Sequence, residues 1–494
     1  MVGVAALSAV LAFARPKGNE ARAAAVEPPN FLIVLVDDQA RNSFTRAYMP
    51  ETFDDIVDRG TMFTNGVAAP PLCCPDRAGI LTGQYPHNHG VFSNDPGYAS
   101  MQDRGDTLPV WLQRAGYRTG FVGKFLNGYT DVAGAAPAPG FDRWFGFMGL
   151  PGYYDYDVSD DGRVRHFGSG RDAYSTDVLT RQALRFLEDS ANSSEPFFLW
   201  LAYEAPHGWR SPIHPCTRSS SPGPPTKAAY RAVKNVALPR PPSFNERDVS
   251  DKPAAIRALH RLNVLAVDRV KDDWHCTLAS LRQLDRGIGG ISNELRRSGE
   301  AQRTVVIYVS DNGNFFGEHR RPNGKSDVYE PALNVPFAVR VPRAYRSGSR
   351  VAKSDAVVSN QDIAATIVDL ADRHLGGVET CAGPDHCRRM DGRSFAPLVG
   401  GPGAWPPDRG VLSEIASGPH DYEAVRTPRY TYSELATGER ELYDLKADPF
   451  ELQNRADDPA YAATQSRLAA RLALLRSCSG VKGRDAPSAS PFCE

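Results

Sequence analysis

Short runs of leucine, β-branched and aromatic residues alternate along the chain with stretches of helical periodicity. This alternation is typical of an α/β fold in which helices sandwich a large, mostly parallel sheet. The predicted strands are residues 30–36, 118–122, 197–202, 304–309 and 336–341. Ahead of the fourth strand, leucine and isoleucine recur every three or four residues from Leu278 to Leu295, which predicts an amphipathic helix that ends before Gly299.

The pattern changes near residue 400, where proline and glycine become frequent. Beyond this point, residues 430–435 and 440–445 flank the sequence Ala-Thr-Gly-Glu, which predicts a β-hairpin, and residues 459–475 predict a last helix. We therefore expect a large domain over residues 29–400 and a smaller C-terminal α+β subdomain with an antiparallel sheet over residues 405–494.

The N-terminus carries an apolar run of twelve residues from Val2 to Phe13. This run is too short to span a bilayer, which takes about 20 residues. It suits the apolar region of a signal peptide, with the alanines between Ala21 and Ala25 available for cleavage. We expect residues 1–25 to be a signal peptide and the mature chain to be secreted or periplasmic. No later segment is long and apolar enough to predict a membrane span.

Charge is balanced over the 494 residues, with 57 Lys and Arg against 58 Asp and Glu and a formal net charge of −1. Such a chain has no global field that would draw it to nucleic acid or to an anionic membrane, so we expect neither as a partner. Any site for an anion must therefore be local.

Six of the eight cysteines fall into three pairs that are close in sequence. An oxidising compartment favours disulfides between them, although six cysteines allow several connectivities. The pairs are Cys216 with Cys276, Cys381 with Cys387, and Cys478 with Cys493. Cys216 lies within residues 211–253, whose Pro- and Ser-rich sequence predicts an irregular excursion over the surface.

Polar residues stand where several predicted strands end. Asp37 and Asp38 follow the first strand, Lys124 the second, His207 the third, and Asp311 with Asn312 the fourth. Because ligands of open α/β sheets bind outside the carboxyl ends of the strands, these endings predict one shared pocket. Carboxylate and amide oxygens suit Ca²⁺ or Mg²⁺ and argue against zinc. Lys124, Lys325 and Arg77 add positive charge for a tetrahedral oxyanion.

A further signal is the sequence Cys73-Cys74-Pro75-Asp76-Arg77, which leads into a predicted helix. Pro75 is tolerated in the first helical turn, so Cys73 is expected just before the helix N-terminus, where backbone N–H groups favour negative charge. The residues alone leave three interpretations of the adjacent cysteines: a vicinal disulfide, a buried thiol pair, or a redox dithiol. The last is disfavoured because redox dithiols normally have two residues between their cysteines.

The pattern C-x-P-x-R followed by x-x-x-L-T-G, from Cys73 to Gly83, resembles the signature of the type I sulfatases of the alkaline phosphatase superfamily. Further motifs of that family follow in order along most of the chain. They are Leu35-Val36-Asp37-Asp38-Gln39, Gly123-Lys124, Ala205-Pro206-His207, Ser310-Asp311-Asn312-Gly313, Gly324-Lys325 and Glu441-Leu442-Tyr443-Asp444-Leu445. Tyr85-Pro86-His87-Asn88-His89 resembles the N-acetylglucosamine-6-sulfatase-like group within a family that also includes arylsulfatases.

The resemblance implies an alkaline-phosphatase-like sulfatase catalytic domain over residues 29–400. It also implies that a formylglycine-generating enzyme oxidises Cys73 to Cα-formylglycine (3-oxoalanine). In the hydrate of that residue, one hydroxyl attacks the sulfur of the ester, and deprotonation of the second expels sulfate. The implied ligands of a Ca²⁺ ion, with Mg²⁺ as the alternative, are Asp37, Asp38, Asp311, Asn312 and the modified Cys73.

Four further residues match functional positions of the family. Arg77 matches the residue that orients the formylglycine, and Lys124 and Lys325 match lysines that bind sulfate. His207 matches the histidine that protonates the leaving alcohol. The predicted activity is hydrolysis of a sulfate ester, from a sulfated sugar or an aryl sulfate, to an alcohol and sulfate.

Two positions depart from the family pattern. Asp76 stands where the signature usually has serine, and Leu126 where arylsulfatases often have a histidine that assists sulfate release. His89 and His319 are the candidates to replace that histidine. Other functions therefore stay open: a phosphonate or phosphate ester hydrolase on the same scaffold, an inactive sulfated-glycan-binding protein that keeps Cys73 as a thiol, and a thiol oxidoreductase.

Overall fold

The computed structural model describes residues 27–209, 215–218, 221–383, 386–416 and 421–478. Their main feature is a ten-stranded sheet with the order β10-β2-β9-β8-β1-β7-β3-β4-β5-β6. Its strands are β1 (Asn30–Val36), β2 (Thr61–Val67), β3 (Arg118–Gly123), β4 (Arg143–Phe147), β5 (Tyr156–Asp160), β6 (Arg163–Phe167), β7 (Phe197–Ala202), β8 (Thr304–Ser310), β9 (Phe337–Arg340) and β10 (Lys353–Ser359).

The centre of this sheet is parallel. β1 lies between β8 and β7, and the parallel order continues through β3 to β4. The predicted strand 336–341 is present as β9, but it runs antiparallel to both β8 and β2. The other antiparallel pairs are β4 with β5 and β5 with β6 at the far edge. The expected large, mostly parallel α/β sheet is thus confirmed, with antiparallel strands toward its edges.

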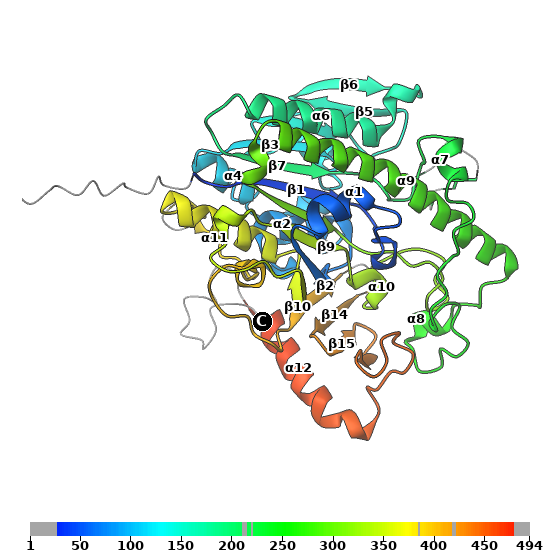
Figure 1. Cartoon of the computed structure of the whole chain (residues 1–494). Coiled ribbons are helices and arrows are strands. Elements are labelled where there is room, and N and C mark those ends of the chain that lie inside the picture. Colours follow the sequence, from blue (N-terminus) through cyan, green and yellow to red (C-terminus); the bar gives the residue numbers. More distant parts are fainter. Residues whose placement is uncertain (1–26, 210–214, 219–220, 384–385, 417–420, 479–494) are drawn as a thin grey trace, which may run out of the picture.

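Helices cover both faces of the sheet (Figure 1). They are α1 (Pro50–Thr52), α2 (Cys73–Thr82), α3 (Pro86–His89), α4 (Leu108–Arg114), α5 (Tyr129–Ala133), α6 (Ser175–Ser190), α7 (Lys227–Arg231), α8 (Ala254–Arg257), α9 (Val264–Arg297), α10 (Glu330–Leu333), α11 (Asp362–Leu375) and α12 (Ala462–Arg476). Phe31, Ile33 and Leu35 of β1 share a core with α2, α4 and α11. The alternate side chains of β1 pack with α6 and α9. This two-sided burial explains why β1 is apolar throughout.

Helix α9 is longer than the sequence predicted. It ends at Arg297 as expected, but it begins at Val264, where the side chain of Asn263 accepts a hydrogen bond from the Ala266 N–H at 2.9 Å. Val264 and Leu265 are 77% and 68% exposed, so the first turn projects from the core. The following turns continue the buried stripe, because Val270 and Trp274 pack in one cluster with Leu278, and the sequence analysis missed this extension.

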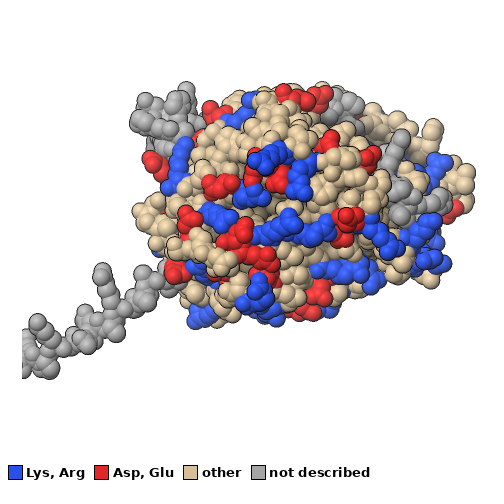
Figure 2. Space-filling view, turned by 90° about the horizontal axis from the view of Figure 1, so that it is seen from above, with Lys and Arg blue, Asp and Glu red and all other residues tan. Residues whose placement is uncertain are grey.

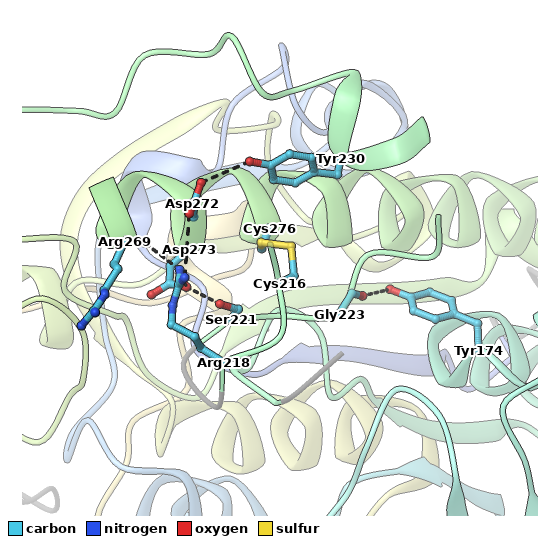
Figure 3. Close-up of a disulfide and its surroundings, with 10 residues drawn as sticks. All are labelled: Tyr174, Cys216, Arg218, Ser221, Gly223, Tyr230, Arg269, Asp272, Asp273 and Cys276. Atoms are coloured by element: carbon cyan, nitrogen blue, oxygen red, sulfur yellow. Dashed lines mark hydrogen bonds and ion pairs between the residues drawn. A yellow bond between two sulfur atoms is a disulfide. The ribbon is translucent and has the colours of Figure 1, made fainter. Parts of the chain in front are cut away.

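A disulfide joins Cys216 to Cys276 on α9, which confirms the first expected pair (Figure 3). Next to it, Arg218 donates to Asp273 Oδ1 at 2.8 Å, and Tyr174 OH donates to the Gly223 carbonyl at 2.7 Å. The chain that leaves the sheet after β7 is therefore fastened to α9 and to the start of α6. Within the predicted irregular excursion it also forms the short helix α7.

The C-terminal region forms a separate antiparallel sheet of β13 (Val411–Ile415), β14 (Tyr422–Arg426), β15 (Tyr430–Leu435) and β16 (Arg440–Asp444), covered by α12. The predicted hairpin is β15 and β16, and the predicted last helix is α12. Val67 and Tyr85 of the large domain share a core with Val411 and Leu472 of this region. The small sheet is thus packed firmly on the large domain.

The remaining cysteine pairs are only partly visible. The short strands β11 (Cys381–Gly383) and β12 (His386–Cys387) place Cys381 opposite Cys387 in backbone register, but these side chains lie outside the description. Cys478 is disulfide-bonded, whereas Cys493 and the predicted signal peptide at residues 1–25 lie outside the described residues.

Acidic and basic side chains are interspersed on the face that Figure 2 shows, which is the view from above Figure 1. This mixture agrees with the balanced charge of the whole chain. Among the described residues, each helix is either too short or too polar to cross a lipid bilayer.

Candidate active site

The loops after β1, β3, β7 and β8 meet the N-terminus of α2 at the carboxyl edge of the central strands. The structure brings all nine sequence-predicted site residues together there, through contacts that link each one to at least one other. They are Asp37, Asp38, Cys73, Arg77, Lys124, His207, Asp311, Asn312 and Lys325. Parallel strands explain this convergence, because their carboxyl ends lie at one edge of the sheet.

Cys73 lies at the centre of the group and is 1% exposed. Its Sγ is 3.0 Å from Lys325 Nζ, 3.6 Å from Asp37 Oδ1 and 3.9 Å from Lys124 Nζ. Cys73 is the first residue of α2, one position inside the helix rather than just before it as predicted. Burial, reinforced by the Asp37 charge, raises the pKa of the thiol well above its usual range despite the two lysines. The unmodified side chain is therefore a neutral thiol and a poor nucleophile.

Cys74 points to a different environment. Both cysteines are free and buried, which selects the buried thiol pair over the vicinal disulfide. The Asn127 N–H donates to Cys74 Sγ at 3.0 Å, and burial raises the pKa of this thiol to about 11. Since neither sulfur favours the thiolate, the arrangement gives no support to a redox dithiol.

Asp37 and Asp38 are presented to the site by a turn at the end of β1. Asp38 has a φ of +65°, a left-handed conformation that is uncommon outside glycine but tolerated by Asp and Asn. Asp37 is fully buried, and Arg77 Nη2 donates to its Oδ2 at 3.1 Å. Burial alone would raise the pKa of Asp37, but Lys124, His207 and Arg77 outweigh it and hold the pKa well below its usual range.

Asp311 and Asn312 approach Asp38 from the end of β8. The Asp38 N–H donates to Asp311 Oδ1 at 3.2 Å, and Asn312 Nδ2 donates to Asp38 Oδ1 at 2.6 Å. Burial and the neighbouring Asp37 charge raise the pKa of Asp311, in spite of Arg77 and Lys325. Carboxylates crowded in this way are stabilised by a bound cation.

The donor set fits a divalent metal ion. Four potential ligand atoms lie within 4.8 Å of one another, one each from Asp37, Asp38, Cys73 and His207. Asn312 Oδ1 is buried and has no hydrogen-bond partner among the described residues, although its Nδ2 is satisfied. An orphaned buried acceptor beside carboxylates is the environment that a hard cation requires.

Arg77 fixes the loops around this group. It lies one helical turn after Cys73, is fully buried, and donates from Nε to Asp311 Oδ2 at 2.8 Å. Its Nη1 donates to the carbonyl of Lys124. One guanidinium thus ties α2 to the loops that follow β1, β3 and β8, a task that its planar set of donors suits.

His207 lies at the open side of the site, with a side chain that is 25% exposed. Its Nε2 is 3.7 Å from Asp38 Oδ2, and its Nδ1 is 3.2 Å from Glu204 Oε1. Burial and Lys124 lower the pKa of His207, but Asp38, Asp37 and Glu204 together outweigh them and raise it. Glu204 was not predicted, although a polar residue three positions before His207 at a strand end was a usable signal.

Asp76 stands on α2 at the position where the family signature usually has serine. It is fully buried, and Asn360 Nδ2 donates to its Oδ2 at 2.7 Å. Burial raises the pKa of Asp76 well above its usual range, although the hydrogen bond from Asn360 opposes this shift. Asn360 is a second residue that the sequence did not indicate.

The two candidate histidines lie elsewhere. His89 is fully buried, and burial together with Arg388 lowers its pKa to about 3. His319 Nδ1 is bonded to Glu246 Oε2 at 2.7 Å, and its ring stacks on Tyr329. Among the described residues, no contact joins either imidazole to Cys73.

Two family models match the chain. Residues 29–373 match the model described as sulfatase, and residues 317–478 match that of the C-terminal part of N-sulphoglucosamine sulphohydrolase. An arylsulfatase of Volvox carteri is 31% identical over 93% of this chain and 76% of its own length. The N-acetylglucosamine-6-sulfatase of Homo sapiens is 29% identical over 93% of this chain and 86% of its own.

Extracellular sulfatase homologs of Caenorhabditis elegans and Drosophila melanogaster are 32% and 31% identical over 75% of this chain. The chain spans only 49% and 31% of the lengths of these two relatives. Among solved structures, one of a protein in complex with its substrate, D-glucosamine-2-N,6-O-disulfate, is similar with a TM-score of 0.72 and 26% identity. That similarity covers 90% of this chain and 97% of the other.

The family model covers well over half of the chain, and the residues that carry the family signature converge at one edge of the sheet. This chain belongs to the sulfatase family.

Proposed function

We propose that this protein hydrolyses the sulfate ester of a sulfated sugar or an aryl sulfate to an alcohol and sulfate, with a formylglycine made from Cys73 and a bound Ca²⁺ ion. The observation that carries the proposal is the placement of Cys73 Sγ between Lys325 and Asp37, at 3.0 and 3.6 Å. A nucleophile at this position lies between a group that binds anions and a group that binds cations.

The metal ligands in this proposal are Asp37, Asp38, Asp311, Asn312 and the modified Cys73. Support comes from the orphaned Asn312 Oδ1 and from the crowding that raises the pKa of Asp311. When bound, the cation supplies Lewis-acid polarisation and lowers the pKa of the nucleophile, and the formylglycine supplies a hydroxyl that attacks sulfur. Mg²⁺ is the alternative ion for the same oxygen ligands.

Lys124 and Lys325 hold the sulfate group. Both ammonium groups lie beside Cys73 Sγ, and both pair with carboxylates, Lys124 with Asp37 and Lys325 with Asp38. Burial would lower the pKa of each lysine, but these carboxylates raise it, so both remain charged. Two fixed cations counter the negative charge that gathers on sulfate oxygens in the transition state.

His207 protonates the leaving alcohol. Its side chain is 25% exposed, while its Nδ1 is buried beside Glu204. The carboxylates that raise the pKa of His207 favour the protonated imidazole, which suits a general acid. Arg77 takes no proton and holds Asp37 and Asp311 in place.

A sulfated amino sugar is the substrate class that the similar proteins favour. Relatives that align over most of this chain are named N-acetylglucosamine-6-sulfatase. The similar solved structure contains a 6-O-sulfated glucosamine. We further propose that the protein acts outside the cytoplasm, in line with its extracellular relatives, and that residues 29–400 form the catalytic domain and 405–494 its subdomain.

The test begins with the chain co-produced with a formylglycine-generating enzyme. The peptide that contains Cys73 is expected to lose about 18 Da in the oxidation. Sulfate release is then measured from N-acetylglucosamine 6-sulfate and p-nitrophenyl sulfate, with a phenylphosphonate monoester as comparison. Removal of metal by EDTA should abolish sulfate release, and Ca²⁺ should restore it.

Two outcomes would contradict the proposal. Faster turnover of the phosphonate than of either sulfate ester would make the protein a phosphonate hydrolase on the same scaffold. An unchanged mass for the Cys73 peptide, with saturable binding of the sulfated sugar and no sulfate release, would make it an inactive binding protein.

A further inference from the structure

Glu204 is a buried carboxylate next to two proposed catalytic residues. It follows β7 and is only 1% exposed, in the turn that carries His207. Its Oε1 is 3.2 Å from His207 Nδ1, and its Oε2 is 4.0 Å from Lys124 Nζ. The carboxylate therefore lies behind the imidazole, on the side away from the open site.

Both carboxylate oxygens of Glu204 and the Nδ1 of His207 are sealed from solvent. Among the described residues, none of these three atoms has a hydrogen-bond partner of standard geometry. A buried carboxylate without a compensating partner is strongly unfavourable, so its charge must be balanced by the nearest cationic groups. Those groups are His207 and Lys124.

The backbone around Glu204 is held independently of its side chain. The His207 N–H donates to the Glu204 carbonyl at 2.8 Å, and Tyr153 OH donates to the His207 carbonyl at 2.9 Å. The Tyr203 N–H donates to the Leu35 carbonyl at 2.9 Å, which anchors the turn to β1. Loss of the Glu204 charge should therefore leave the turn in place.

We propose that Glu204 is a positioning residue: it binds the Nδ1 side of His207 and so keeps Nε2 directed at the oxygen of the leaving alcohol. This inference rests on the proposed function. In an imidazole, the partner of one ring nitrogen fixes the orientation of the ring and the role of the other nitrogen. Without Glu204, the ring can rotate, and proton delivery loses its geometry.

The test compares Glu204→Gln with the parent enzyme on two sulfate esters. N-acetylglucosamine 6-sulfate has a poor alcohol leaving group that needs a proton, whereas p-nitrophenyl sulfate has a good one that does not. We expect kcat on the sugar sulfate to fall about 10- to 100-fold, with KM nearly unchanged. On the aryl sulfate, kcat should stay within about 3-fold of the parent.

Glu246→Gln is the matched control. Glu246 is also a buried carboxylate that contacts a histidine Nδ1, in its case that of His319 at 2.7 Å. Its substitution should lower kcat on both esters equally and by less than about 3-fold. If Glu204→Gln fails to fold, Glu204→Asp replaces it, because the shortened side chain retains the charge but withdraws it from Nδ1.

A second experiment asks whether Glu204 acts through His207. In a His207→Ala background, Glu204→Gln should cause no further loss of kcat on the sugar sulfate, because residues that act as one unit are not additive. A further loss as large as that in the parent would overturn the inference, as would equal losses on both esters in the single variant. If the parent enzyme releases sulfate from neither ester, the proposed function fails and this inference fails with it.

Discussion

Two buried charge clusters in this protein are built differently. At the start of α11, Asp362 and Arg409 are both fully buried, and Arg409 donates to the two carboxylate oxygens at 2.5 and 2.7 Å. The backbone N–H groups of Ser359 and Arg393 donate to the same carboxylate, each at 2.8 Å. This single carboxylate is saturated, because both of its oxygens accept hydrogen bonds from neighbouring protein groups.

The cluster around Cys73 has the opposite character. Asp37, Asp38 and Asp311 lie together, and the neighbouring Asn312 Oδ1 is left without a hydrogen-bond partner among the described residues. Arg77, Lys124 and Lys325 pair with these carboxylates, but the pKa of Asp311 is still raised, which fits the divalent cation that we propose. The saturated cluster serves stability, whereas the cluster around Cys73 leaves a buried acceptor free for the cation that we propose.

The largest effect is expected from Cys73→Ala, which breaks the ligand-binding cluster at its centre. Loss of the proposed nucleophile should lower kcat by at least about 10⁴-fold. The melting temperature should change little, because Cys73 contributes few stabilising bonds of its own. Sulfate release and thermal unfolding measure the two effects.

Cys74→Ser is the matched control for that variant. It alters the adjacent buried sulfur, which accepts a hydrogen bond from Asn127 N–H outside the group around Cys73. It should leave kcat within about 3-fold of the parent. A complete loss of activity in Cys74→Ser would instead indicate that the two sulfurs act together.

The next effect concerns the saturated cluster. Arg409→Ala leaves Asp362 buried without its main cation and should lower the free energy of unfolding by about 3–5 kcal/mol. Chemical denaturation measures this loss, and kcat of the remaining folded protein should be unchanged.

Arg429→Ala removes a 52% exposed partner of Asp444 and should lower the free energy of unfolding by only about 0–1 kcal/mol. Equal losses in the two variants would contradict the distinction.

The smallest effect is a pH dependence at the contact between α3 and β13. Burial opposes protonation of His87, but Glu414, at 2.7 Å from Nδ1, raises the pKa of this imidazole to about 9. A pKa raised on folding gives stability that is fully present below the unfolded pKa of about 6.5 and is lost as pH rises toward 9. We expect the free energy of unfolding to fall on the order of 1 kcal/mol over that range.

Glu414→Gln provides the comparison for this pH dependence. Removing the carboxylate charge should flatten the decline in stability between pH 6.5 and 9 that is assigned to His87. Denaturation midpoints at several pH values measure the slope. An identical slope in parent and variant would show that another group is responsible.

Much of the fold was predictable because the apolar runs and turn residues that specify its elements lie close together in the sequence. Strand β1 coincides with the predicted residues 30–36, and β15 and β16 form the predicted hairpin. The prediction missed β2 and β10, and it did not reveal that β9 is antiparallel. Apolar runs identify a buried strand, but its direction and neighbours depend on the path of the chain between strands.

The candidate site was predictable to the extent that its residues stand at strand ends or within the family signature. Asp37, Asp311 and Lys124 each follow an apolar strand, and parallel strands bring such positions to one edge. The surroundings of Asp76 were not predictable, because its partner Asn360 lies 284 residues away in sequence.

The sequence by itself determined the central strands and the C-terminal hairpin, and it placed the charged side chains at the strand ends. It also indicated the family, because periodicity and motif spacing are properties of neighbouring residues. Only the tertiary structure decided that Glu204 lies behind His207, that Cys74 packs away from Cys73, and that the C-terminal sheet shares a core with the large domain. These contacts depend on how distant segments pack against each other, and packing is a property of the whole folded chain.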